Sequence, residues 1–95
     1  AIYPLDSFVL NLSDGKYIRT QVQLEFEGND IPRRFYNRSV LLRDALISLI
    51  TKKSSDELLD ESGKTKLKDE IRQTINDTLK REEVKKVYLT QFVIQ

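Results

Sequence analysis

The sequence predicts a small α+β domain of the order β-β-α-α-β, in which a small sheet carries two helices packed on one face. Three patterns support this fold class. Residues 16–27 alternate between apolar and polar side chains, as in a half-buried strand. Apolar residues recur at helical spacing over 31–50 and again over 67–79, and residues 84–95 return to a strand pattern. The 95 residues suffice for one hydrophobic core and not for two, so we expect a single domain spanning 1–95.

The first two strands form a predicted hairpin. Within residues 5–13, Phe8, Leu10 and Leu12 share one face, and Asp14-Gly15 supplies the turn because this pair tolerates positive φ angles. The second strand, 16–27, has one apolar and one polar face, which predicts an antiparallel pair covered on one side. Its apolar face consists of Ile18, Thr20, Val22, Leu24 and Phe26.

Two helices and a short connector are expected next. Asp30 and Pro32 suit a helix start, although the weaker apolar spacing at 37–39 allows the first helix to begin there instead. In the connector, Ser55 precedes acidic residues and is interpreted as the cap of one helical turn. The second helix is predicted over about 64–81, with a narrow apolar stripe of Leu67, Ile71, Ile75 and Leu79.

The last strand, 84–95, is predicted to carry apolar residues on both faces. Val87, Leu89 and Val93 lie on one face. Tyr88, Phe92 and Ile94 lie on the other. Burial on both sides is typical of an inner strand, so this strand is predicted to lie more centrally in the sheet.

The composition excludes several kinds of chemistry. There is no Cys and no His, which excludes a Cys/His zinc site, a His-ligated haem, a thiol nucleophile and a Ser-His-Asp relay. Ser62-Gly63-Lys64-Thr65 is similar to the end of a phosphate-binding loop, but Leu58 stands where that loop needs its first glycine. We interpret this segment as a helix start and expect no enzyme and no cofactor.

Two further patterns have both a structural and a functional interpretation. The acidic cluster could serve a carboxylate hydrolase, but caps and solubilising charges explain it more simply; its members are Asp56, Glu57, Asp60 and Glu61. Arg43-Asp44 is either an interface ion pair or a surface charge pair, and we favour the second. Asn11, Asn37 and Asn76 match the glycosylation pattern, which is short and is treated as chance.

Charge is segregated along the chain although the total is only +1. Residues 31–54 carry six basic residues and one acidic residue, whereas residues 55–63 carry four acidic residues and no basic one. A basic helix can bind nucleic acid, which is the alternative function; a protein-facing or self-assembling surface fits equally well. The candidate protein-interface residues are Arg19, Arg33, Arg34 and Arg38.

An ordered set of segments resembles the FliL family of flagellar basal-body-associated proteins. The C-terminal stretch 84–95, ending on Gln95, is similar to the C-terminus of that family, and Tyr17-Ile18-Arg19 is similar to the start of its second strand. Residues 43–47, Arg-Asp-Ala-Leu-Ile, resemble its Arg-Asp helix. The second-helix region is matched by Leu58, Gly63-Lys64, Leu67, Asn76 and Leu79.

The resemblance implies a specific role. FliL proteins are single-span inner-membrane proteins whose C-terminal domain lies in the periplasm, has a stomatin-like (SPFH) fold and assembles into rings associated with the MotA/MotB stator of the flagellar motor. No catalysis is attributed to the family. We therefore expect a periplasmic scaffold that supports motility and binds no nucleic acid. Because the chain begins at Ala1 without Met, we expect the membrane anchor and the cytoplasmic N-terminus to be absent from it.

Overall fold

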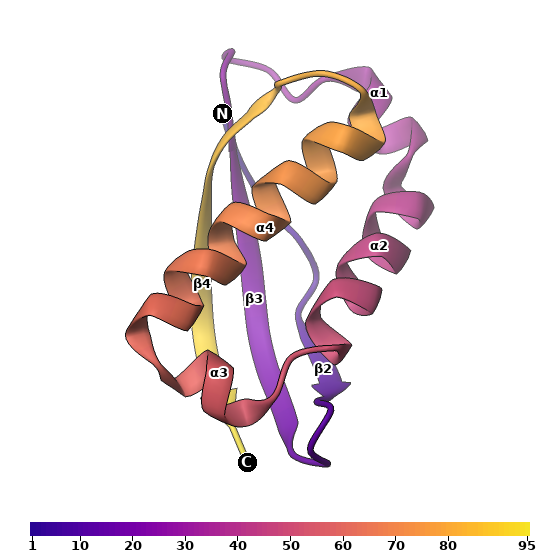
Figure 1. The fold of residues 1–95 in the computed structure, drawn as a ribbon. Helices are drawn as coiled ribbons and strands as arrows, with labels where there is room; N and C mark the ends of the chain where they lie inside the picture. Colours follow the sequence, from indigo (N-terminus) through magenta and orange to yellow (C-terminus); the bar gives the residue numbers. More distant parts are fainter.

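A four-stranded antiparallel sheet is built around one long central strand, β3. The computed structural model describes residues 1–95 (Figure 1). On one side of β3 (Tyr17–Phe26) lies β4 (Val84–Ile94), and on the other side β1 (Ile2–Pro4) and β2 (Phe8–Asn11) follow each other along the same edge. The predicted hairpin is confirmed, since β2 and β3 pair antiparallel around a turn at Gly15, whose φ is +87°.

The alternation predicted for β3 is confirmed in full. All five residues of its apolar face, Ile18, Thr20, Val22, Leu24 and Phe26, are buried. Residues at the intervening positions are exposed or half-buried. Helices cover the first face only, so the sheet has one packed and one uncovered side (Figure 1).

The prediction that the last strand lies centrally is wrong, because β4 is an edge strand. Thr90 pairs with Gln21 and Val93 pairs with Arg19, so two residues of β4 lie opposite one residue of β3. This bulge is centred on Gln91, whose φ is +52°, and it shifts the alternation by one residue. Phe92 and Ile94 therefore join Val87 and Leu89 against the core, whereas Val93 is exposed.

Four helices cover one face of the sheet, which confirms the α+β class with helices packed on one side (Figure 1). The predicted first helix is divided into α1 (Arg33–Asn37) and α2 (Ser39–Thr51), because the backbone leaves the helical region at Arg38. The connector forms α3 (Ser55–Leu59), and the last helix, α4 (Glu61–Leu79), begins three residues earlier than predicted. No helix has the length and apolar composition that crossing a membrane requires.

The cap of α3 differs from the prediction. Ser54, not Ser55, is the N-cap, and it forms a capping box with Glu57. Ser55 is buried, and both its hydroxyl and its backbone N–H donate to the carboxylate of Asp14 in the β2–β3 turn. These hydrogen bonds lower the pKa of Asp14, the contact with the Ser55 hydroxyl most of all. The contact ties the hairpin to the helical layer.

The interpretation of Ser62-Gly63-Lys64-Thr65 as a helix start is confirmed. Gly63 lies in the first turn of α4, where the backbone of α3 passes so close that a Cβ on Gly63 would stand 1.8 Å from the carbonyl oxygen of Glu57. Glycine is therefore required by the sharp α3–α4 corner.

The core lies between the sheet and the helices. It joins alternate residues of β3 with the stripe of α4 predicted from the sequence and with Leu42, Leu46 and Ile50 of α2. All of these side chains are at most 4% exposed. Complete burial of two helix stripes against one sheet face leaves the opposite sheet face, the outer sides of the helices and the α3–α4 corner as the surfaces available for contacts.

Candidate functional site

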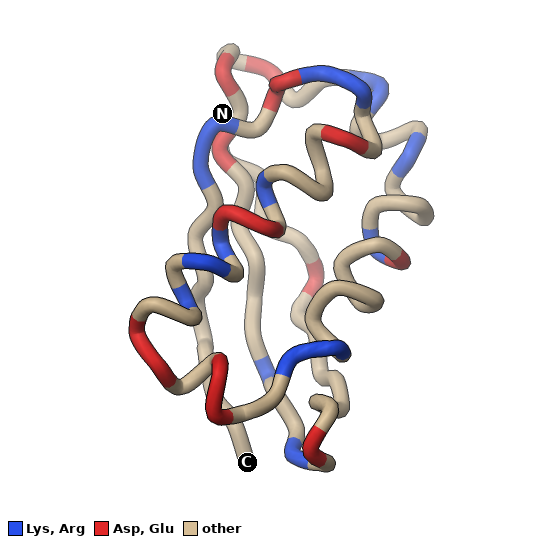
Figure 2. The backbone as a smooth tube through the Cα atoms, viewed as in Figure 1, with Lys and Arg blue, Asp and Glu red and all other residues tan.

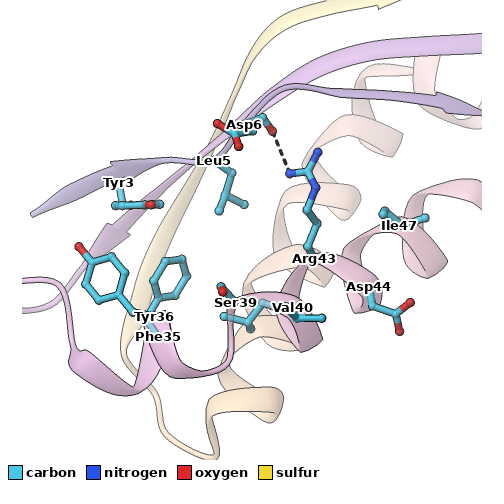
Figure 3. A pocket seen from close by; sticks show the side chains of 11 residues that line it. Tyr3, Leu5, Asp6, Phe35, Tyr36, Ser39, Val40, Arg43, Asp44 and Ile47 are labelled. Atoms are coloured by element: carbon cyan, nitrogen blue, oxygen red, sulfur yellow. Dashed lines mark hydrogen bonds between the residues drawn. The ribbon is translucent and has the colours of Figure 1, made fainter.

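The largest hollow of the surface is a groove between the β1–β2 edge of the sheet and the helices α1 and α2. Its volume is about 470 Å³, and seven of the eleven residues that line it are hydrophobic. Figure 3 shows these side chains converging from the two layers. The lining residues are Tyr3, Leu5, Asp6, Phe35, Tyr36, Ser39, Val40, Leu42, Arg43, Asp44 and Ile47.

Aromatic rings form one end of the groove. Tyr3 of β1 packs edge-on against Phe35 of α1, with ring centroids 5.1 Å apart, and Phe35 in turn packs against Phe26 of β3 at 5.2 Å. Tyr3 also meets Tyr36 at 5.8 Å. Edge-to-face pairs of this kind favour fixed ring orientations. This end of the groove is therefore a preformed surface held by the core.

Arg43 forms the other end, in a role that differs from both interpretations of the Arg43-Asp44 pair. Its two terminal nitrogens donate to the backbone oxygens of Asp6 and Ser7, each at 3.1 Å. These oxygens lie where the sheet edge is interrupted between β1 and β2. The guanidinium also covers the ring of Phe8 at 4.1 Å. Asp44 points away from it (Figure 3). Arg43 is thus a clamp between α2 and the broken strand edge.

Beside the groove, large apolar side chains are open to solvent. Val40 is 80% exposed, Leu41 is 59% exposed and Tyr36 is 50% exposed. All three lie on α1 or α2, on the side that does not face the core. Together with the groove they form an apolar surface that the domain itself leaves uncovered. Such surfaces on small proteins are typical of protein–protein contacts.

The four candidate interface arginines do not form one surface. Arg33 is exposed and Arg34 half-buried on α1, and Arg38 is half-buried at the α1–α2 junction, so these three lie next to the groove. Arg19 lies on the uncovered face of the sheet, where its neighbours across the strands are Val9 and Val93. The sequence pattern showed that these residues are basic but not that the sheet separates them.

The uncovered sheet face carries its own polar cluster. The hydroxyl of Tyr88 donates to Glu25 Oε1 at 2.7 Å, and Lys85 Nζ lies 3.6 Å from Glu25 Oε2. The hydrogen bond from Tyr88, with a smaller contribution from Lys85, lowers the pKa of Glu25, and the same hydrogen bond raises the pKa of Tyr88. Both groups therefore keep their ordinary protonation states at neutral pH, and the cluster is a cross-strand contact.

In the acidic cluster of residues 56–61, Glu57 completes the capping box of α3, and the other carboxylates are exposed. The Glu57 carboxylate accepts the backbone N–H of Ser54 at 3.0 Å, which lowers its pKa, and Asp60 accepts the hydroxyl of Ser62. Nothing in the structure gathers three or more metal-ligating side chains. The arrangement therefore supports the capping interpretation of this cluster.

Asn76 is the residue whose role sequence reasoning missed. It is buried, its Oδ1 accepts the backbone N–H groups of Glu83 and Val84 at 3.1 and 2.9 Å, and its Nδ2 donates to the oxygen of Val84 at 3.0 Å. The one available signal was a polar residue next to the apolar stripe of α4. Its partners lie seven and eight residues away, beyond the reach of helix periodicity.

Comparison with known proteins gives a consistent result. A family model described as flagellar basal body-associated protein FliL matches residues 2–95. The chain is 35% identical over 98 residues to a flagellar protein FliL of Aquifex aeolicus (strain VF5), covering 99% of the chain and 61% of that protein. It is 30% identical over 91 residues to a flagellar protein FliL of Bacillus subtilis (strain 168), covering 96% of the chain and 65% of that protein. The chain thus spans less than two thirds of the length of either relative.

Proposed function

Because the chain belongs to the FliL family of flagellar basal-body-associated proteins, we propose that it is the periplasmic domain of a scaffold that assembles into rings and supports the MotA/MotB stator. Membership in this family identifies a structural protein of the flagellum rather than an enzyme, as the composition predicts. Neither a hydrolase nor a nucleic-acid-binding module has a comparable argument. The ring, the stator contact and the periplasmic location are the parts that the proposal adds.

The observation that carries the proposal is the apolar surface on α1 and α2. Tyr36 and Val40 line a groove of about 470 Å³ and Leu41 follows Val40 on α2, and the domain leaves all three at least half exposed. Removing apolar surface from water gains about 25 cal/mol per Å², so a complex in which a partner covers these side chains is stabilised. A scaffold needs such surfaces, because its work consists of binding other proteins.

The positions of the arginines suggest that the domain contacts neighbours on two sides. Arg33, Arg34 and Arg38 flank the groove, whereas Arg19 lies on the uncovered sheet face. A subunit of a ring uses two different surfaces for its two neighbours and needs a third for any other partner. We assign these four residues to candidate contact surfaces on that basis.

The experiment is charge reversal beside the groove in a motile cell. R33E and R38E change the charge next to α1, and K68E on the exposed outer side of α4 is the matched control. Arg34 is left intact because its Nε is buried. We expect R33E and R38E to reduce swimming in viscous medium and to reduce the amount of stator protein that co-purifies, while K68E leaves both unchanged.

Unchanged motility and unchanged co-purification in R33E and R38E would remove these residues from the proposed function. The location is tested separately by fusing alkaline phosphatase to Gln95 of the full-length protein, because this enzyme is active only after export. An inactive fusion that accumulates in the cell would contradict the periplasmic location.

A further inference from the structure

We propose that the groove of one copy receives the α3–α4 corner of a second copy, so that the domain associates head to tail. The corner is defined here as residues 55–61, and its outermost apolar side chain is Leu59. This inference rests on the proposed ring assembly and names the surfaces that would carry it. The physical basis is complementarity in shape, in polarity and in charge between two ends of the same molecule.

The corner has an apolar side chain without a partner. Leu59 is the last residue of α3 and is 61% exposed, although Leu58 beside it is fully buried in the core. The groove offers the matching surface, since Tyr36 and Val40 border it and are also exposed. A leucine side chain inserted between them would remove all three from water.

The charges around the two surfaces have opposite signs. Leu59 is preceded by Asp56 and Glu57 and followed by Asp60 and Glu61, all four of which are exposed. The segment that contains the corner, 55–63, has four acidic residues and no basic one, whereas α1 and the start of α2 beside the groove carry Arg33, Arg34 and Arg38 and no acidic residue. Opposite charges at the rim of an apolar contact orient the partners and suppress other pairings.

The orientation within the groove follows from its own charges. Its α1 end is flanked by arginines, and its other end is lined by two acids, Asp6 and Asp44, beside Arg43. The acidic corner is therefore expected to approach from the α1 end, with its carboxylates near Arg33 and Arg38. Leu59 then enters between Tyr36 and Val40.

The groove and the corner lie at opposite ends of the domain, so the corner of a molecule cannot reach the groove of the same molecule. α1 and the start of α2 are at one end and α3 is at the other (Figure 1), and the acidic residues of the corner gather at the end away from α1 (Figure 2). A contact between two different surfaces is heterologous, and repeating it generates a closed ring or an open filament. The domain measures 36 × 23 × 19 Å, so its end surfaces are small and the contact should be weak unless the copies are held close together.

The test uses cysteine pairs, since these 95 residues contain no native Cys. The chain carries a histidine tag before Ala1 and is held on phosphatidylcholine vesicles that contain a nickel-chelating lipid, which supplies the high local concentration. V40C and L59C are mixed in equal amounts and treated with a short bis-maleimide. We expect a V40C–L59C dimer as the main product, little product from either variant alone, and a ladder of larger species from the double variant.

Aspartate variants test the same contact without crosslinking. V40D and L59D introduce charge at exposed positions, so both should keep the circular dichroism and urea midpoint of the parent chain. Each should lower association on vesicles by about tenfold or more. When the two variants are mixed, the intact Val40 groove of an L59D chain can still receive the intact Leu59 of a V40D chain. The mixture should therefore yield dimers and nothing larger. V93D on the uncovered sheet face is the matched control and should associate like the parent.

The outcomes separate this inference from the proposed function. A dominant V40C–V40C product, or loss of association in V93D while V40D and L59D still associate, would overturn the head-to-tail contact and leave ring assembly through another face. If densely loaded vesicles show no more association than vesicles carrying the chain at low surface density, both this contact and the self-assembly of the domain are overturned.

Discussion

Replacing Asn76 with alanine should be among the most damaging single changes in the chain that leave no large cavity. The Asn76 side chain makes three hydrogen bonds at the α4–β4 turn, of 2.9, 3.0 and 3.1 Å, with the backbone of Val84 and Glu83. Val84 is only 2% exposed. In N76A its N–H and C=O lose their partner in a place that water does not reach.

The expected cost follows from those two buried groups. Each buried backbone group left unpaired costs about 1–3 kcal/mol, so the loss of two such partners in N76A should lower the free energy of unfolding by about 2–6 kcal/mol. The whole free energy of unfolding of a domain of this size is about 5–15 kcal/mol. With a urea dependence of about 1.5 kcal/mol per M, the unfolding midpoint should fall by about 1–4 M.

The assay is urea unfolding followed by circular dichroism, with two comparison variants. D77A changes the exposed neighbour on α4 and should shift the free energy of unfolding by less than about 0.5 kcal/mol. N76D keeps the acceptor for Glu83 and Val84 but places a carboxylate oxygen against the oxygen of Val84. N76D should therefore regain stability relative to N76A when its carboxyl becomes protonated in acid. A loss below about 1 kcal/mol in N76A would refute the reasoning, because it would mean that the turn satisfies its backbone groups without this side chain.

Three further predictions concern the corner, the clamp and the hairpin. G63A should cost about 1–3 kcal/mol by overpacking against α3 despite the better helix propensity of alanine, whereas G28A, whose Cβ would meet nothing nearer than 4.0 Å, should be close to neutral in the same urea assay. R43K should lose about 1–2 kcal/mol, because an ammonium group lacks the rigid planar fork that reaches both carbonyls while covering the Phe8 ring, and amide hydrogen exchange of β2 should accelerate. The pKa of Asp14 is lowered in the folded chain by its hydrogen bonds to Ser55, so its stabilising contribution is present above its ordinary pKa of 3.8 and is lost as the pH falls below that value. D14N should therefore unfold at a lower urea concentration at neutral pH and show a weaker dependence on pH between neutral and acid conditions; an unchanged pH dependence would contradict this role.

Local sequence patterns correctly predicted the elements that pack one face against a single neighbouring layer. The alternation of β3 and the stripe of α4 were confirmed residue by residue, because both elements lie regularly against the same core. The family resemblance was confirmed by the comparison over residues 2–95. The candidate arginines remain proposals, since their function depends on partners.

Patterns failed where a single residue interrupts the regular geometry. β4 was predicted to be central because its apolar residues alternate onto both faces, yet a bulge at Gln91 shifts the later ones onto the core side. The break at Arg38, where the backbone leaves the helical region, falls where the apolar spacing weakens over 37–39, so the sequence did allow a helix to begin there, as α2 does at Ser39. Periodicity assumes an unbroken repeat, and bulges and breaks are set by the packing of the whole sheet against the helices.

The sequence by itself determined the α+β class, the hairpin, the faces of β3 and α4, and membership in a family of flagellar proteins. Tertiary structure alone decided what Arg43, Gly63 and Asn76 do, because each acts on backbone atoms of another element. Arg43 clamps carbonyls 36 and 37 residues away. The groove also exists only in three dimensions, since β1 supplies one wall and α1 and α2 the other. Short-range periodicity records which side of an element is buried, whereas a contact between distant backbones leaves no repeat in the sequence.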